Sequence, residues 1–137
     1  MRYLFITYLF ILPFSAIAQN KLDKEILIIL DKDSGAYEKV RLALIKNDFI
    51  VKDDGNKDTI TTYPREFKTM DGFCVFRAAI KDSLVVLSGV YGMKKLDDWG
   101  YTTSPRKYKP IIYYKGSKAW RFLQKVAETI GNKFSYR

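Results

Sequence analysis

The order of hydrophobic and polar positions along the chain first predicts a strand and then a helix. A continuous apolar run over 25–30 predicts a buried strand, because short, partly β-branched runs bounded by turn residues are typical of strands. The next apolar positions recur at helical spacing over 36–44. This spacing predicts a helix, with Ser34 placed to cap it.

Two pairs of apolar runs predict β-hairpins. The runs over 49–51 and 59–63 flank 53–56, whose Asp, Gly and Asn residues favour a chain reversal. The runs over 73–80 and 84–91 are joined by only three polar residues. Such a short connection is typical of two antiparallel strands that pair with each other.

The last part of the chain predicts a long irregular segment and a second helix. No periodicity is visible over 92–109, and an irregular stretch of this length is usually functional or mobile. A short strand is expected over 111–114. Ser117 is then placed to cap a helix that runs to Ile130, with Gly131 at its C-terminal cap.

This order, β-α-β-β-β-β-(β)-α, predicts the α+β class. We expect an antiparallel sheet of about five or six strands with two helices packed on one face. No internal repeat, linker or low-complexity segment interrupts 19–137. The sequence therefore predicts a single α+β domain over this range.

Residues 1–18 have the three parts of a secretory signal peptide. Arg2 gives the basic start, an apolar run follows over 3–14, and Ala16 and Ala18 are the small residues before the cleavage position. The apolar run would cover about 18 Å as a helix, against roughly 30 Å for a bilayer core, so an uncleaved anchor is the less favoured alternative. No cysteine follows the run, which excludes a lipoprotein. We expect an exported protein, periplasmic or extracellular, with no transmembrane span after cleavage.

Short features in the first half of the mature chain support a family resemblance. They are Gly35–Val40 with Leu44, Phe49–Val51, and Ile60–Pro64 with its Ile-Thr-Thr run. In these features, and in the style of its leader, the chain resembles small exported envelope proteins of Bacteroidota. The resemblance implies a TBP-like or helix-grip α+β domain and a place in the cell envelope. It assigns no catalytic residue.

The composition removes the commonest catalytic and metal-binding side chains. The chain has no histidine and one cysteine, which excludes His-dependent nucleophilic catalysis, His-ligated zinc or haem, thiolate metal sites and an internal disulfide. The Asp-rich stretch at 31–35 lacks three of the residues that a calcium loop requires. The acid pair Asp97-Asp98 has no converging partner for hydrolysis. We therefore expect a non-enzymatic protein without cofactor or metal.

The single cysteine, Cys74, is expected to be an inert core residue. Strand alternation places it on the same face as Phe76, Ala78 and Ile80, with Arg77 on the other face. A buried free thiol acts as a small hydrophobic side chain, whereas a reactive one needs an exposed electropositive setting.

The positive charge is concentrated in one part of the chain. The formal net charge is +9, or +8 after cleavage of the leader. Residues 19–98 contain 14 basic and 14 acidic side chains, whereas residues 99–127 contain seven basic side chains and no acid. Aromatic residues are interleaved with these cations, a combination that is typical of surfaces that bind polyanions.

We therefore predict an exported binding domain that uses a basic-aromatic surface. Its candidate residues are Trp99, Tyr101, Arg106, Lys107, Tyr108, Lys109, Lys115 and Lys118. Export disfavours nucleic acid as the partner, and favours an anionic envelope component such as a lipid head group or an acidic glycan, or a protein. A solvated positive face without a partner is the alternative.

Two other functions remain open at this point. A helix-grip pocket lined by Trp120, Phe76 and Val90 would bind an apolar small ligand between the sheet and the last helix. A small exported α+β domain could instead be the inhibitor or immunity protein of a secreted enzyme.

Overall fold

A computed structural model describes residues 19–20, 22–31, 35–96, 99–100, 102–103, 105 and 107–137. The leader over 1–18, the predicted cap Ser34, the acid pair at 97–98, and the candidate binding residues Tyr101 and Arg106 lie outside the described residues.

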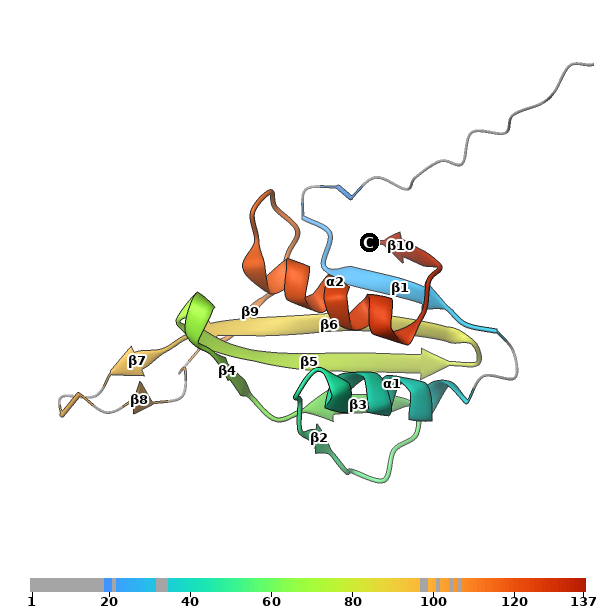
Figure 1. The fold of residues 1–137 in the computed structure, drawn as a ribbon, viewed down its shortest axis with the longest axis horizontal. Helices are drawn as coiled ribbons and strands as arrows, with labels where there is room; N and C mark the ends of the chain where they lie inside the picture. The colour runs from blue at the N-terminus through green and yellow to red at the C-terminus, as the bar shows by residue number, and fades with distance from the viewer. Residues whose placement is uncertain are drawn as a thin grey trace, which may run out of the picture.

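The described elements are strands of two to ten residues, two helices and a 3₁₀ turn (Figure 1). In chain order they are β1 (Glu25–Ile29), α1 (Ala36–Lys46), β2 (Val51–Lys52), β3 (Thr59–Thr62), β4 (Arg65–Phe67), the 3₁₀ turn η1 (Lys68–Met70), β5 (Gly72–Lys81), β6 (Leu84–Met93), β7 (Lys95–Leu96), β8 (Thr102–Thr103), β9 (Lys109–Pro110), α2 (Lys118–Ile130) and β10 (Phe134–Tyr136).

The sheet is antiparallel and is built around the hairpin of β5 and β6. Its main path runs β10-β1-β6-β5-β3-β2, with β4 added to β5 and β9 added to β6. Both helices lie on one face of this sheet, α2 across β6 and β1, and α1 beside β3 and β5 (Figure 1). The predicted α+β class, with two helices on one face of an antiparallel sheet, is confirmed.

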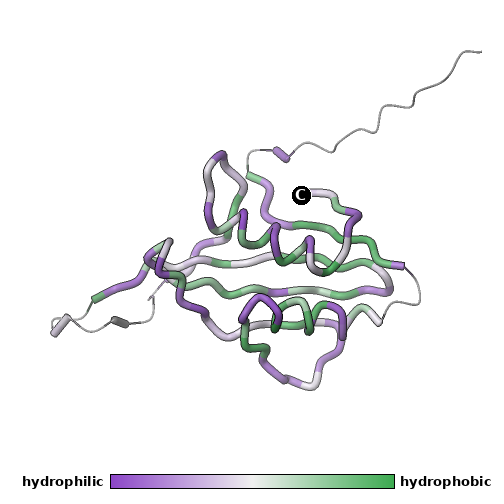
Figure 2. The backbone as a smooth tube through the Cα atoms, in the orientation of Figure 1, coloured by the Kyte–Doolittle hydropathy of each residue, from purple (hydrophilic) through white to green (hydrophobic). Residues whose placement is uncertain are grey.

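The core lies between the helices and the inward face of the sheet. Alternate residues of each strand point into it, so the strands carry one buried and one more exposed face. Figure 2 shows that β1 is hydrophobic along its length, whereas the connection from β2 to β3 is hydrophilic. The largest fully buried side chains are Trp120, Phe76, Ile26, Ile28, Leu44, Ile60, Leu87 and Leu123.

The two helices begin differently. The Ser117 hydroxyl accepts a hydrogen bond from the Trp120 amide at 3.1 Å, which confirms the predicted cap of α2. Gly131 is the C-terminal cap, as predicted, with extended backbone. α1 follows Gly35, whose φ of 58° is left-handed and which offers no side-chain cap. At the C-terminal end of α1, the side-chain amide of Asn47 donates to the Ala43 carbonyl at 2.8 Å.

The sheet has eight strands, more than the pattern predicts. The additional strands, β4, β9 and β10, are short, and each is added to a longer strand of the predicted sheet. β10 pairs with β1, and the side chains of Arg137 and Glu25 meet at 2.6 Å beside this pair. The strand expected at 111–114 is displaced: β9 ends at Pro110, and 111–114 is irregular. The predicted irregular segment contains the short pair β7–β8.

No helix among the described residues is long and apolar enough to cross a bilayer.

Cys74 is fully buried on the inward face of β5, with Phe76 and Ala78, while Arg77 is exposed on the other face. The predicted placement is confirmed. Burial raises the pKa of the Cys74 thiol to about 12. The thiol is therefore neutral in the folded protein under ordinary conditions and unreactive as a nucleophile.

The raised pKa of Cys74 predicts a loss of stability at alkaline pH. The neutral thiol stabilises the fold fully below pH 9, and this contribution declines as the pH rises toward 12, because the unfolded thiol ionises first. We expect the stability advantage of the wild type over Cys74→Ala, measured by urea unfolding under reducing conditions, to shrink by about 2 kcal/mol between pH 8 and pH 10.5. Parallel pH profiles for the two proteins would contradict this.

Candidate functional site

α2 has one buried face and one cationic face. Its buried side chains are Trp120, Leu123, Val126, Ala127 and Ile130. On the outer side, Lys118, Arg121 and Lys125 follow one another at spacings of three and four residues, which place them along one strip of the helix surface. All three are exposed. The amphipathic pattern that buries the helix therefore also gathers its cations.

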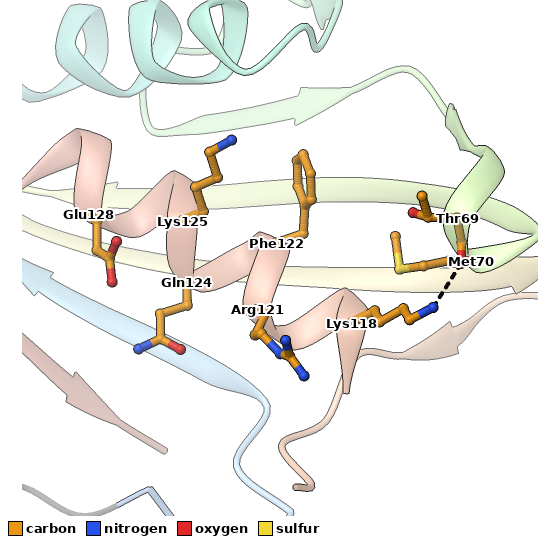
Figure 3. Close-up of a pocket in the computed structure, with 8 residues that line it drawn as sticks. All are labelled: Thr69, Met70, Lys118, Arg121, Phe122, Gln124, Lys125 and Glu128. Carbon is orange, nitrogen blue, oxygen red and sulfur yellow. Dashed lines mark hydrogen bonds between the residues drawn. The ribbon is translucent and has the colours of Figure 1, made fainter. Parts of the chain in front are cut away.

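An open groove of about 470 Å³ lies along this strip, between α2 and η1 (Figure 3). This cationic groove is lined by Thr69, Met70, Lys118, Arg121, Phe122, Gln124, Lys125 and Glu128. Three cationic side chains share it with a single carboxylate, so its net charge is positive. In Figure 3 the Lys118 ammonium points toward η1, and the Glu128 carboxylate lies at the opposite end of the groove.

The three cations have few partners within the protein. The Lys118 ammonium donates to the Thr69 carbonyl at 3.2 Å, and the Lys125 nitrogen lies 5.6 Å from the centroid of the Phe122 ring. The Arg121 side chain has no hydrogen bond or ion pair with any other residue that the structure describes. The guanidinium can therefore form charge-assisted hydrogen bonds with an incoming anion. By contrast, ion pairs hold Arg41, Arg65, Lys94 and Arg137.

β6 holds η1, the wall opposite α2, in place. The Tyr91 hydroxyl donates to the Met70 carbonyl at 2.5 Å, and the Lys94 amide donates to the Asp71 carbonyl at 2.9 Å. Asp71 itself has a left-handed φ of 51°. Burial raises the pKa of Tyr91, which keeps the phenol protonated and able to donate.

The start of β5 approaches β6 too closely for any residue but glycine. A Cβ atom at Gly72 would lie 2.5 Å from the Gly92 carbonyl oxygen and 2.6 Å from Cε2 of Tyr91. A side chain at this position would displace the ring that anchors η1.

A second cavity, of about 460 Å³, lies on the other side of η1. This apolar cavity is lined by Thr69, Met70, Asp71, Tyr91, Pro110, Ile111, Ile112, Tyr114, Gly116, Ser117, Lys118 and Ala119. It shares Thr69, Met70 and Lys118 with the cationic groove. The two cavities are therefore neighbours, and the Lys118–Thr69 hydrogen bond lies at their junction.

Phe122 links the groove to an aromatic cluster. Its ring lies 4.4 Å from that of Phe67, edge to face, and 6.3 Å from that of Phe49. The Arg65 guanidinium lies 4.5 Å from the Phe67 ring and 5.3 Å from each of the other two, and it also donates to the Asn47 carbonyl at 2.5 Å. Arg65 therefore has a structural role, since it joins the end of α1 to Phe122, which lines the groove.

The structure divides the predicted basic-aromatic surface between two cavities. Lys118 lies in the cationic groove. Lys107 and Lys109 instead line a cavity of about 390 Å³ beside the end of β6, together with Lys95.

Among the remaining predicted residues that the structure describes, Trp99, Tyr108 and Lys115 line none of these three cavities. Trp99 is 86% exposed, Lys115 is exposed in the turn before α2, and Tyr108 is half-buried. Tyr101 and Arg106 are not among the described residues.

The sequence prediction did not include most of the groove among its candidate residues. Arg121 and Lys125 were counted in the basic segment, and their spacing from Lys118 was the signal that could have identified one helix face. Thr69 and Met70 could not have been identified in this way, because their approach to α2 depends on the tertiary fold.

The predicted apolar pocket lined by Trp120, Phe76 and Val90 is wrong in its residues. Trp120 and Phe76 are fully buried in the core, and Val90 lies on the opposite face of β6 from the inward-facing Gly89 and Tyr91. The three side chains therefore do not line one cavity. The space between sheet and helix is filled instead, with Trp120 packed against the rings of Tyr113 and Tyr136.

Within the described part of the chain, no group of three or more Cys, Asp or Glu side chains could hold a metal ion.

Comparison with known families finds no family model that matches this chain. No curated protein matches it significantly either.

The close approach at Gly72 predicts a sharp loss of stability on substitution. We expect Gly72→Ala to lower the free energy of unfolding by about 1–3 kcal/mol, because the added Cβ meets backbone that cannot move freely. Gly131→Ala is the matched control, since a Cβ there meets only the side chains of Ile28 and Leu30 at 3.0 Å. Urea unfolding checks the pair, and equal losses would show that the backbone contact is not the cause.

Proposed function

We propose that this protein is an exported, non-enzymatic binding domain that recognises anionic lipid head groups through the cationic groove. The observation that carries this proposal is that Lys118, Arg121 and Lys125 line one open groove together with a single carboxylate. The Arg121 guanidinium, which pairs with none of the described residues, supports it further, because a planar fork of donors suits a phosphate or carboxylate.

Apolar side chains within the groove favour a lipid surface over a hydrated acidic glycan. Met70 and Phe122 are both half-buried and lie beside the cations. Cations next to exposed apolar surface suit the boundary between head groups and acyl chains, where both kinds of contact are made at once.

The sequence supports the remaining parts of the proposal. The leader over 1–18 favours export, and the lack of histidine favours binding over catalysis. The proposal also includes a TBP-like or helix-grip type of fold and a place in the cell envelope, as the resemblance implies. Two helices over one face of an antiparallel sheet are compatible with that type.

Vesicle binding tests the proposal. We expect residues 19–137 to co-sediment with vesicles of phosphatidylglycerol and phosphatidylcholine, but not with phosphatidylcholine alone, and to dissociate as salt rises from 20 to 300 mM. Replacing Lys118, Arg121 and Lys125 together by Gln should weaken binding by roughly 100-fold, at about 1 kcal/mol for each cation near the surface.

A second triple variant separates the groove from the net charge. Replacing Lys57, Lys81 and Lys133 by Gln removes the same charge from exposed positions outside the groove. We expect this control to weaken vesicle binding less than threefold. Equal losses in the two variants would contradict a role for the groove. Retention on an acidic polysaccharide without vesicle binding would contradict the lipid assignment.

A further inference from the structure

We propose that the ligand is a single-chain anionic amphiphile, with its acyl chain in the apolar cavity and its anionic group at Lys118 and Arg121. This inference rests on the proposed function, because it uses the same cations, and it adds a second contact surface. It names the apolar cavity as the part that selects the ligand.

The first observation is that the two cavities are adjacent. Thr69, Met70 and Lys118 line both of them, and each cavity measures more than 400 Å³. Cavities of this size are within the range that binds small organic ligands. A ligand that crosses the junction would therefore contact a cationic surface at one end and an apolar surface at the other.

The second observation is that two of the four hydroxyls lining the apolar cavity, those of Tyr91 and Ser117, already have partners within the protein. The Tyr91 hydroxyl donates to the Met70 carbonyl, and the Ser117 hydroxyl accepts from the Trp120 amide. The cavity then presents mainly apolar surface from Met70, Pro110, Ile111, Ile112, Tyr114 and Ala119. A hydrocarbon chain can pack against this apolar surface, although the Thr69 and Tyr114 hydroxyls and the Asp71 carboxylate also line the cavity.

The third observation is where the charges lie. Lys118 stands at the junction, and among the described residues its ammonium donates one exposed hydrogen bond, to the Thr69 carbonyl. Arg121 lies one helical turn further along the groove. The carboxylates that line the two cavities are those of Asp71, which is exposed beside η1, and Glu128, which lies far along α2. Lys118 is thus the cation that lines both cavities.

The experiment compares three probes that separate the chain from the charge. Isothermal titration of residues 19–137 below the critical micelle concentration would use dodecanoate, butanoate and dodecyl maltoside. We expect dodecanoate to bind at least tenfold more tightly than butanoate, which lacks the chain, and than dodecyl maltoside, which lacks the charge. Equal affinity for dodecanoate and butanoate would overturn the inference.

Chemical-shift mapping locates the chain without any substitution. On addition of dodecanoate, the amide resonances of Ile112, Tyr114 and Ala119 should shift together with that of Lys118. Those of Lys95 and Lys107, which line the separate cavity beside β6, should stay unchanged. Shifts confined to Lys95 and Lys107, or to α2 beyond Arg121, would overturn the assignment of the apolar cavity.

Ala119→Trp then tests the cavity by filling it. The half-buried Ala119 lies in the first turn of α2 and lines only the apolar cavity. We expect the variant to lose dodecanoate binding at least tenfold while its binding to anionic vesicles falls less than threefold. Vesicle binding without any dodecanoate binding in the wild type would refute this inference and leave the proposed function intact. Failure of vesicle binding by the wild type would refute the proposed function itself.

Discussion

The pairing of β5 with β6 holds ten residues of each strand in register, and most of the sheet depends on it. β1 and β9 add to β6, while β3 and β4 add to β5. Because side chains alternate along a strand, this one register decides which residues of the central hairpin meet the helices. It places Cys74, Phe76 and Leu87 in the core, and it brings Tyr91 to the end of β6 where η1 crosses.

The candidate site follows from the fact that β5 and β6 are long. Their far ends extend beyond the part of the sheet that pairs with β1 and β3. There the Tyr91 main chain pairs with β9, while its side chain reaches η1. The Tyr91 hydroxyl and the Lys118 ammonium both donate hydrogen bonds to main-chain carbonyls of this turn. The two cavities exist on either side of η1 because it stands against the start of α2.

Local pattern was sufficient for the elements whose stability is local. The hairpin over 73–91 shows alternation and a tight turn, and Ser117 is a local cap, so both were predictable. β10 was not, since Phe134–Tyr136 is a strand only through its pairing with β1. Only part of the groove could be predicted. The spacing of its cations can be read from the sequence of α2, but Thr69 lies 49 residues from Lys118. The pattern correctly marked Trp120 and Phe76 as inward-facing, yet it could not tell a filled core from a cavity.

The pairing of β1 with β10 has a consequence for how the chain folds. The main-chain groups of Glu25 and Arg137 bond to each other in both directions, and their side chains meet across 112 residues of sequence. Such long-range closure is entropically costly and slow. The sheet can therefore be completed only when both ends of the domain are present together. A partly synthesised chain without β10 cannot complete the sheet. Under the proposed export, this delay would leave the chain open until it has crossed the membrane.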